Sequence, residues 1–463
     1  MTLPSRETTA LWALVALVAV TFLTGGGARE DLLSLVFLRP LAMLALAAGV
    51  VLLPRRAWSD NRALILAALA VPAITALHLV WLPPALWHAL PGRELAEQID
   101  RAVGHAGAWR PLSLVPYRTV NALLAFTVPL AGLFLALAVP RRRLAAVVYV
   151  VLAAAVLSAV IGLLQTIGGA GNGFYFYRVT NEGSAVGLFA NRNHNAVLLA
   201  LAFPLIAATT SLLPGTAEQL RLREWGAAGF AVLMLPFLFA TQSRAGLLLG
   251  AICLALAVWT YRPPSEYLQS RRAKAKFDPR LLFGAAAVVA VGLLSAIMLR
   301  TSAIQRLASL GRTDDELRFR VWGPIWRMVG DYFPFGSGNG TFVEAFWIGE
   351  SDALLKPTFL NHAHNDWLEI VLTGGLPLLA AVLVGGFVVV RQGIAFIRGA
   401  STSRQAVLRR LGLVVVAVMA LSSLYDYPLR VPSLALLFAV AAVWLAGREP
   451  AAEAADVGIN PRT

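Results

Sequence analysis

The sequence predicts an all-α polytopic membrane protein. Of its 463 residues, 58% are hydrophobic and only 14% are charged, and the mean hydropathy is +0.70. A soluble core of this size is not so apolar. Because a helix needs roughly 20 apolar residues to cross a bilayer, we expect about twelve transmembrane helices.

The apolar runs give these helices in order along the chain. They cover residues 10–26, 32–53, 63–84, 119–140, 144–168, 195–214, 226–241, 245–261, 281–299, 365–390, 411–427 and 431–446. An even number of helices leaves both termini on the same side. The expected organisation has four parts: helices one to nine with short loops in 1–299, a large loop in 300–364, helices ten to twelve in 365–446, and a tail in 447–463.

Loop charges set the expected orientation, since positive residues are retained in the cytoplasm. With the N-terminus inside, 22 basic residues fall in cytoplasmic segments, against 9 in the outer segments apart from the loop 300–364. That loop holds 7 basic and 7 acidic residues and faces outward. The net charge of +14 is therefore a topology signal, strengthened by attraction to anionic lipid. The basic run 271–280 lies between two expected spans, so we expect no nucleic-acid partner.

Two features near the spans have alternative explanations. The first apolar run follows Arg6 and ends near Gly25–Ala28, as in a signal peptide. Its removal would reverse the fit of every later loop, so we expect a retained helix. Cys253 lies mid-helix and has no cysteine to pair with, which indicates a buried inert thiol.

The segment 360–375 is the most informative one, because it places four polar side chains at the start of an apolar helix. They are His364, Asn365, Asp366 and Glu369. Ionisable groups at a bilayer are costly unless they are paired or hydrated, so they indicate a functional site. Acidic residues in a first turn also favour the helix dipole, and that role stays open for Asp366 and Glu369.

Other polar motifs lie in the outer segments. The loop 86–117, with a short interfacial helix expected around Arg93–Val103, has no assigned chemistry. The remaining motifs are Asn191-Arg-Asn-His, Ser243-Arg-Ala-Gly, Arg318-Phe-Arg-Val-Trp322, Gly336-x-Gly-x-Gly-Thr-Phe342 and the turn Tyr425–Pro432.

In this order, together with His364-Asn and Gly375, the motifs resemble the O-antigen ligase and Wzy-type polymerase superfamily. The resemblance covers residues 180–380 by motif and the whole chain by topology. Ligases commonly carry a threonine three residues after the glycine that matches Gly375, whereas this chain has Leu378. That departure favours the polymerase branch.

The resemblance implies a GT-C-like fold with a periplasmic helical cap from the loop 300–364. It implies glycosyl transfer at the periplasmic face of the bacterial inner membrane, without a metal or other cofactor. The donor would be an undecaprenyl-pyrophosphate-linked glycan, and the acceptor a hydroxyl of a glycan or lipid-linked saccharide. We favour a repeat-unit polymerase of O-antigen or exopolysaccharide. The alternative is a ligase that transfers finished polysaccharide to lipid A-core.

The resemblance also suggests residue roles that fit the chemistry. Histidine can accept a hydroxyl proton at neutral pH, and arginine pairs bidentately with phosphate without deprotonating. The expected catalytic residues are His364, Arg244 and Arg318. The expected substrate-binding residues are Arg192, Arg320, Asn365, Asn191 and His194.

Competing interpretations have less support in the residues. His362 and His364, with His194, could suggest zinc, but a spacing of two suits a shared metal poorly. The Gly336–Gly340 run lacks the strand and helix that frame a dinucleotide loop, so a sharp turn explains it better. A lipid-linked glycan flippase or transporter usually shows related halves and interrupted midplane helices, which we do not find here. A non-catalytic scaffold for an envelope complex is the remaining alternative.

Overall fold

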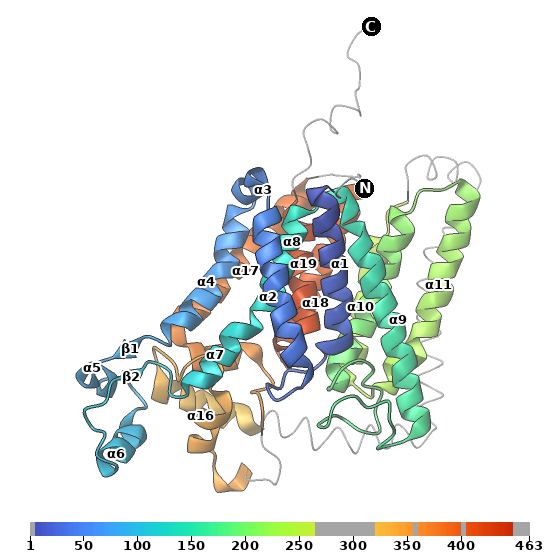
Figure 1. Cartoon of the computed structure of the whole chain (residues 1–463). Helices are drawn as coiled ribbons and strands as arrows, with labels where there is room; N and C mark the ends of the chain where they lie inside the picture. The colour runs from blue at the N-terminus through green and yellow to red at the C-terminus, as the bar shows by residue number, and fades with distance from the viewer. Residues whose placement is uncertain (1–4, 264–319, 355–359, 400–403, 448–463) are drawn as a thin grey trace.

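The computed structural model describes residues 5–263, 320–354, 360–399 and 404–447. Within these ranges the helices stand side by side as a bundle (Figure 1). Its first half contains α1 (Arg6–Thr24), α2 (Ser34–Leu52), α3 (Arg55–Asp60), α4 (Arg62–Leu77), β1 (Trp81–Leu82), α5 (Pro84–His88), α6 (Glu94–Ala102), β2 (Arg110–Pro111), α7 (Pro116–Ala125), α8 (Thr127–Ala138), η1 (Arg141–Arg143) and α9 (Ala145–Gly168). Its second half contains α10 (Arg192–Leu212), α11 (Ala217–Ala240), α12 (Arg244–Thr260), a helix at 320–332, α16 (Phe342–Gly349), η2 (Asp352–Leu354), α17 (Asp366–Arg398), α18 (Arg404–Ser422), η3 (Pro428–Arg430) and α19 (Pro432–Ala446).

The predicted all-α membrane fold is confirmed. Among the described residues, 7 helices are long and apolar enough to cross a membrane, and three shorter apolar helices accompany them. The short strands β1 and β2 pair antiparallel, with Trp81 opposite Pro111. The expected helix at 281–299 lies outside the described residues.

Several helix boundaries differ from the prediction, α11, α17 and α18 among them, and two further differences have a clear local cause. The run 63–84 stays helical only to Leu77, because Trp81 and Leu82 pair in a strand and two prolines follow. The run 119–140 is two helices with a break at Phe126. Pro129 explains the break, since proline has no backbone N–H and its ring clashes with the carbonyl four residues earlier.

The helix α10 forms the centre of one half of the bundle. Nearly every residue from Asn193 to Ser211 is buried, and the helix packs against α9, α11, α12 and α18. Elsewhere in the bundle α8 and α19 pack on each other, with α2 against α8 and α18 against α19. Because neighbouring helices cover α10 on all sides, it is a fixed support for the polar groups at its start.

The arginine-rich segments expected in the cytoplasm gather at one end of the bundle. Nη1 of Arg143 donates to the hydroxyl of Thr8 at 3.0 Å, and Nη2 of Arg141 donates to the carbonyl of Val443 at 3.3 Å. The start of α1 and the end of α19 therefore lie at the same end. The polar motifs lie at the opposite end, near α16 in Figure 1.

Two glycines allow the bend in α17: Gly375 within the helix and Gly336 in the turn that packs against it. Gly375 has φ +61° and ψ −164°, so the helix is kinked there, and the N–H of Leu376 donates to the carbonyl of Pro334 at 2.8 Å. The N–H of Gly338 donates to the carbonyl of Thr373 at 2.8 Å. A Cβ on Gly336 would lie 2.6 Å from that same carbonyl oxygen. The turn that begins at Gly336 therefore needs glycine to approach α17.

Candidate functional site

The starts of three helices and one turn meet at the end of the bundle opposite the arginine-rich segments. These are the starts of α10, α12 and α17, and the turn at 423–431 between α18 and α19. Motif residues cap each helix: side-chain oxygens of Asn191, Ser243 and Asn365 accept hydrogen bonds from backbone N–H groups. Such caps satisfy donors that a helix start leaves unpaired. Asn191 and Asn365, expected to bind substrate, thus shape the backbone of the site.

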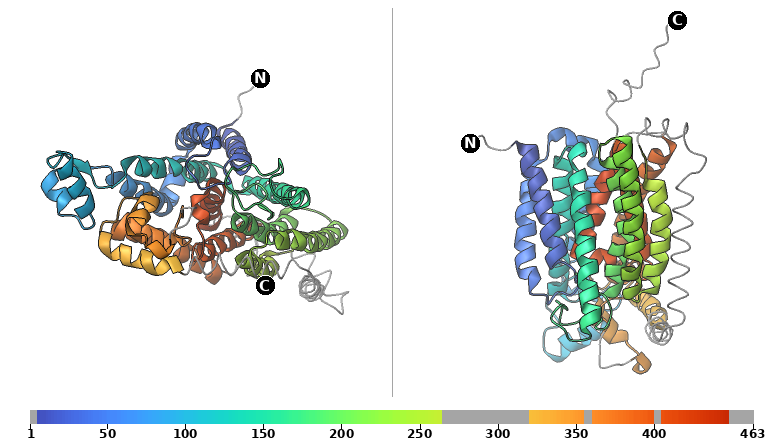
Figure 2. Two further views of the ribbon diagram at one scale, coloured as in Figure 1. Left: turned by 90° about the horizontal axis from the view of Figure 1, so that it is seen from below. Right: turned by 90° about the vertical axis from the view of Figure 1, so that its right-hand side faces the viewer.

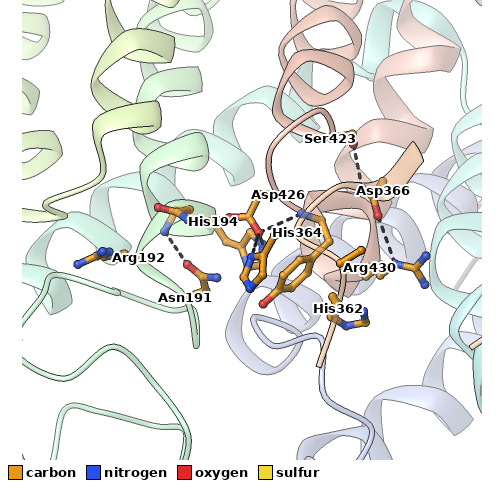
Figure 3. A network of polar contacts seen from close by, with 12 residues as sticks. Asn191, Arg192, His194, His362, His364, Asp366, Ser423, Asp426 and Arg430 are labelled. Carbon is orange, nitrogen blue, oxygen red and sulfur yellow. Dashed lines mark hydrogen bonds and ion pairs between the residues drawn. The ribbon is translucent and has the colours of Figure 1, made fainter. Parts of the chain in front are cut away.

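The carboxylate of Asp426 lies at the centre of the site (Figure 3) and is 1% exposed. Its Oδ2 accepts a hydrogen bond from Nδ2 of Asn193 at 2.7 Å. Its Oδ1 lies 3.3 Å from Nδ1 of His364 and 3.9 Å from Nε2 of His194. A buried carboxylate needs such partners, since an isolated one is strongly disfavoured away from water. Asp426 therefore joins α10 to the segment before α17.

Asn193 extends this connection to α12. The hydroxyl of Ser243 donates to Oδ1 of Asn193 at 2.8 Å. Arg244, the next residue, is the first of α12 and is exposed, while Arg192 is the first residue of α10. Arg192 and Arg244, both expected to bind pyrophosphate, are therefore the first residues of two helices. Hydrogen bonds through Asn193 connect the starts of these helices to Asp426. In Figure 3 the side chain of Arg192 lies at the edge of the group, on the side away from Arg430.

The described part of the motif at 318–322 contacts the same place through Trp322. Nε1 of Trp322 donates to the carbonyl of Ala363 at 3.0 Å, one residue before His364. Arg320 begins the helix at 320–332 and is exposed. Arg318 lies outside the described residues.

Three histidines surround the ring of Tyr427. The ring centroids of His194, His362 and His364 lie 5.0, 4.4 and 5.0 Å from its own. The N–H of Tyr427 donates to Oδ1 of Asp426 at 3.0 Å. Within the part of the chain that the structure describes, no three His, Cys, Asp or Glu residues form a group suited to a metal ion. Aromatic contacts of this kind hold imidazole rings in fixed orientations.

His364 has an unusual backbone conformation for a residue with a side chain. Its φ is +49°, in the left-handed region, and its side chain is 16% exposed. Such a conformation costs on the order of 1–3 kcal/mol and persists where the surroundings hold it. The N–H of Asp366 donates to the carbonyl of Ser423 at 3.0 Å and fixes the chain just beyond. When the Nδ1–H of His364 donates a hydrogen bond to Asp426, Nε2 is the acceptor nitrogen of the neutral ring.

A second group of charged residues, which is mostly buried, holds the backbone around His364 in place. Nε of Arg430 lies 3.2 Å from Oδ1 of Asp366, and Nη2 lies 3.2 Å from Oε1 of Glu369. Oε1 of Glu369 also lies 3.0 Å from Nδ1 of His362, and Oε2 accepts the N–H of Ala363 at 2.9 Å. Asp366 and Glu369, for which a helix-dipole role was left open, are thus buried ion-pair partners. Burial lowers the pKa of His362, and the charge of Glu369 opposes that effect.

Sequence reasoning missed Asp426, Tyr427 and Arg430 as site residues. They belong to the turn Tyr425–Pro432, which the motif comparison included without a chemical role. One signal was available, because an acidic and a basic residue between two apolar helices are costly unless they are paired. Their partners could not be read from it, since Asp426 and Asn193 are 233 positions apart.

A comparison with known families agrees with the motif order. Residues 229–383 match a family model described as O-antigen ligase. The matched stretch holds the motifs at Ser243, Arg318, Gly336 and His364 and ends before the turn that carries Asp426. No curated protein matches the chain.

Proposed function

We propose that this protein is a glycosyltransferase of the bacterial inner membrane that acts in polysaccharide biosynthesis. The match of residues 229–383 to the O-antigen ligase family supports this proposal. Its donor is a glycan on undecaprenyl pyrophosphate, and its acceptor is a saccharide hydroxyl on the periplasmic side. The loop charges and the position of the arginine-rich segments, at the end away from the site, support that orientation.

The contact between His364 and Asp426 is the observation that carries the proposal. Nε2 of His364 accepts the proton of the acceptor hydroxyl as its oxygen forms a bond to the anomeric carbon. The bond from that carbon to the pyrophosphate oxygen breaks, and the leaving group takes the electron pair. Asp426, 3.3 Å from Nδ1, selects the tautomer and stabilises the imidazolium that forms.

The arginines balance the charge that develops on the leaving pyrophosphate. Arg244 and Arg318 bind it, with Arg192 and Arg320 as secondary contacts, because a guanidinium offers two parallel N–H donors to phosphate. His194, expected to bind substrate, is 1% exposed beside Asp426, so it acts on the substrate through that carboxylate. Asn191 and Asn365 hold the helix starts from which these side chains extend.

Substitutions test the role of the pair. His364→Ala in purified protein in lipid vesicles should lower transfer by roughly two to four orders of magnitude, by analogy with acid–base and electrostatic contributions elsewhere. Asp426→Asn should lower the maximal rate more than it raises KM, since Asp426 acts through His364. The matched control is His105→Ala, an exposed histidine in the loop after α6. Wild-type rates in the His364 variant would overturn the mechanism.

We favour the polymerase over the ligase on Leu378 and on the full Asn-His-Ala-His-Asn-Asp-Trp form of the motif. Leu378 is buried one turn beyond the kink, so the residue type there acts through the packing of α17. A deletion strain should then accumulate single lipid-linked repeats and make no long polymer. Long polymer on the lipid carrier with bare lipid A-core would assign the ligase instead. Lipid-linked repeats confined to the cytoplasmic leaflet would indicate a flippase.

A further inference from the structure

A small lobe projects sideways from the end of the bundle that carries the site. It comprises β1, α5, α6 and β2, residues 81–111, and extends beyond the other helices when seen from below (Figure 2, left). The lobe has its own fixed structure. Nε1 of Trp87 donates to the carbonyl of Pro111 at 2.9 Å, and a bidentate ion pair joins Arg110 to Asp100.

The lobe is also held firmly against the bundle. The buried guanidinium of Arg93 donates to the carbonyls of Leu112 at 2.7 Å and Gly336 at 3.3 Å, and it lies over the rings of Trp87 and Tyr332. The N–H of Leu112 donates to the carbonyl of Val80 at 3.1 Å, beyond the end of α4. The height of the lobe relative to the membrane-spanning helices is therefore fixed.

The helix α6 shows an exposed apolar stripe. Leu95, Ile99 and Val103 recur every four residues, so they share one side of the helix, and all three are exposed, Ile99 at 54%. Arg101 and Glu97 pair with each other on the other side. Asp100 faces inward to Arg110. The charged and the buried sides thus leave a third side that is both apolar and uncovered.

Exposed apolar side chains also occur on α4, which precedes the lobe in the chain. They occur at Leu66 and Leu77 of α4, in the segment after it and in the lobe. In chain order they are Leu66, Leu77, Val80, Trp81, Leu86, Leu95, Ile99, Val103 and Trp109. α4 is an apolar helix of the spanning bundle, and tryptophan favours the boundary between acyl chains and headgroups.

We infer that the lobe is an interfacial anchor whose α6 stripe inserts into the bilayer leaflet on the side of His364. The occupant of the surface is phospholipid, at the boundary of headgroups and acyl chains. A short amphipathic helix with Leu and Ile on one face and charges on the other binds membranes in this way. Because Arg93 ties the lobe to Gly336, the anchor also sets the position of the Gly336 turn against α17. The inference stands independently of the proposed reaction.

Spin-label accessibility measures the depth of this helix directly. In a Cys253→Ser background, Ile99→Cys and, as matched control, Arg101→Cys carry a nitroxide in nanodiscs of phosphatidylethanolamine and phosphatidylglycerol. Both positions are exposed, and two residues at roughly 100° each point their side chains about 160° apart. Collisions with oxygen report lipid, and collisions with a nickel chelate report water.

The label at 99 should collide with oxygen several-fold more, relative to the nickel chelate, than the label at 101. Equal access of the nickel chelate to both positions would overturn the inference, since the stripe would then lie in water. A label at 99 that is immobile and shielded from both reagents would also overturn it, because protein and not lipid would then cover the helix. Both substitutions are at exposed positions, so neither result depends on a folding defect.

Discussion

Replacing Arg430 by methionine should destabilise the protein far more than replacing a matched surface arginine. Arg430 lies 3.2 Å from Glu369 and its side chain is 20% exposed, while the carboxylates of Glu369 and Asp366 are almost fully buried. Arg178 lies at the same 3.2 Å from Asp31 but is 82% exposed. Removing one partner of a buried pair costs about 3–5 kcal/mol because a charge stays buried without compensation, whereas an exposed pair contributes about 0–1 kcal/mol.

Thermal unfolding of the purified variants in one detergent measures the difference. Arg430→Met should lower the midpoint several-fold more than Arg178→Met. Adding Glu369→Gln to Arg430→Met should recover part of the loss, since a neutral amide is less costly to bury than an unpaired carboxylate. Equal midpoints for the two single variants would refute the reasoning, because burial would then make no difference to pairs of equal length.

Three further predictions concern the helix kink, the leaving group and the orientation. Gly375→Ala should cost at least about 2 kcal/mol in unfolding experiments, since it adds left-handed strain and a Cβ 2.2 Å from the carbonyl oxygen of Pro334. Gly386→Ala in the same helix, with nothing within 4 Å, should stabilise by up to about 1 kcal/mol; an equal loss at both positions would refute the account of the kink. Arg244→Lys should lower transfer about 10- to 100-fold in vesicle assays, because lysine lacks the paired donors, and full activity would remove Arg244 from the pyrophosphate site. A reporter inserted at Ser351 should read periplasm and one fused after the last residue cytoplasm, and a cytoplasmic signal at Ser351 would reverse the topology.

Hydropathy was sufficient to predict the bundle, because crossing a bilayer imposes one length and one composition on each helix. Where the helices stop or bend depends on local backbone chemistry that hydropathy does not register. Phe126 ends α7 ahead of Pro129, and Trp81 leaves the helical run to pair with Pro111. These boundaries follow from proline geometry and strand pairing, which the hydropathy averaged over a segment does not detect.

The candidate site was only partly predictable, for a different reason. His364 was identified because its neighbourhood concentrates polar groups at a helix start. Its partner Asp426 lies 62 positions away, on a turn whose folded position depends on the packing of α18 and α19. From the sequence alone, Asp366 and Glu369 cannot be distinguished from acidic residues that favour the helix dipole in a first turn. In the structure both pair with Arg430.

The turn that carries Asp426 has a consequence for the order in which the molecule is made. α19 is the last helix of the described chain, so the hairpin of α18 and α19 leaves the ribosome after every other element of the site. Until then Asn193 and His364 lack their shared carboxylate, and Asp366 and Glu369 lack Arg430. The candidate site is therefore incomplete while the earlier helices are inserted, and its buried charged groups gain these partners only when the hairpin of α18 and α19 packs against the rest of the bundle.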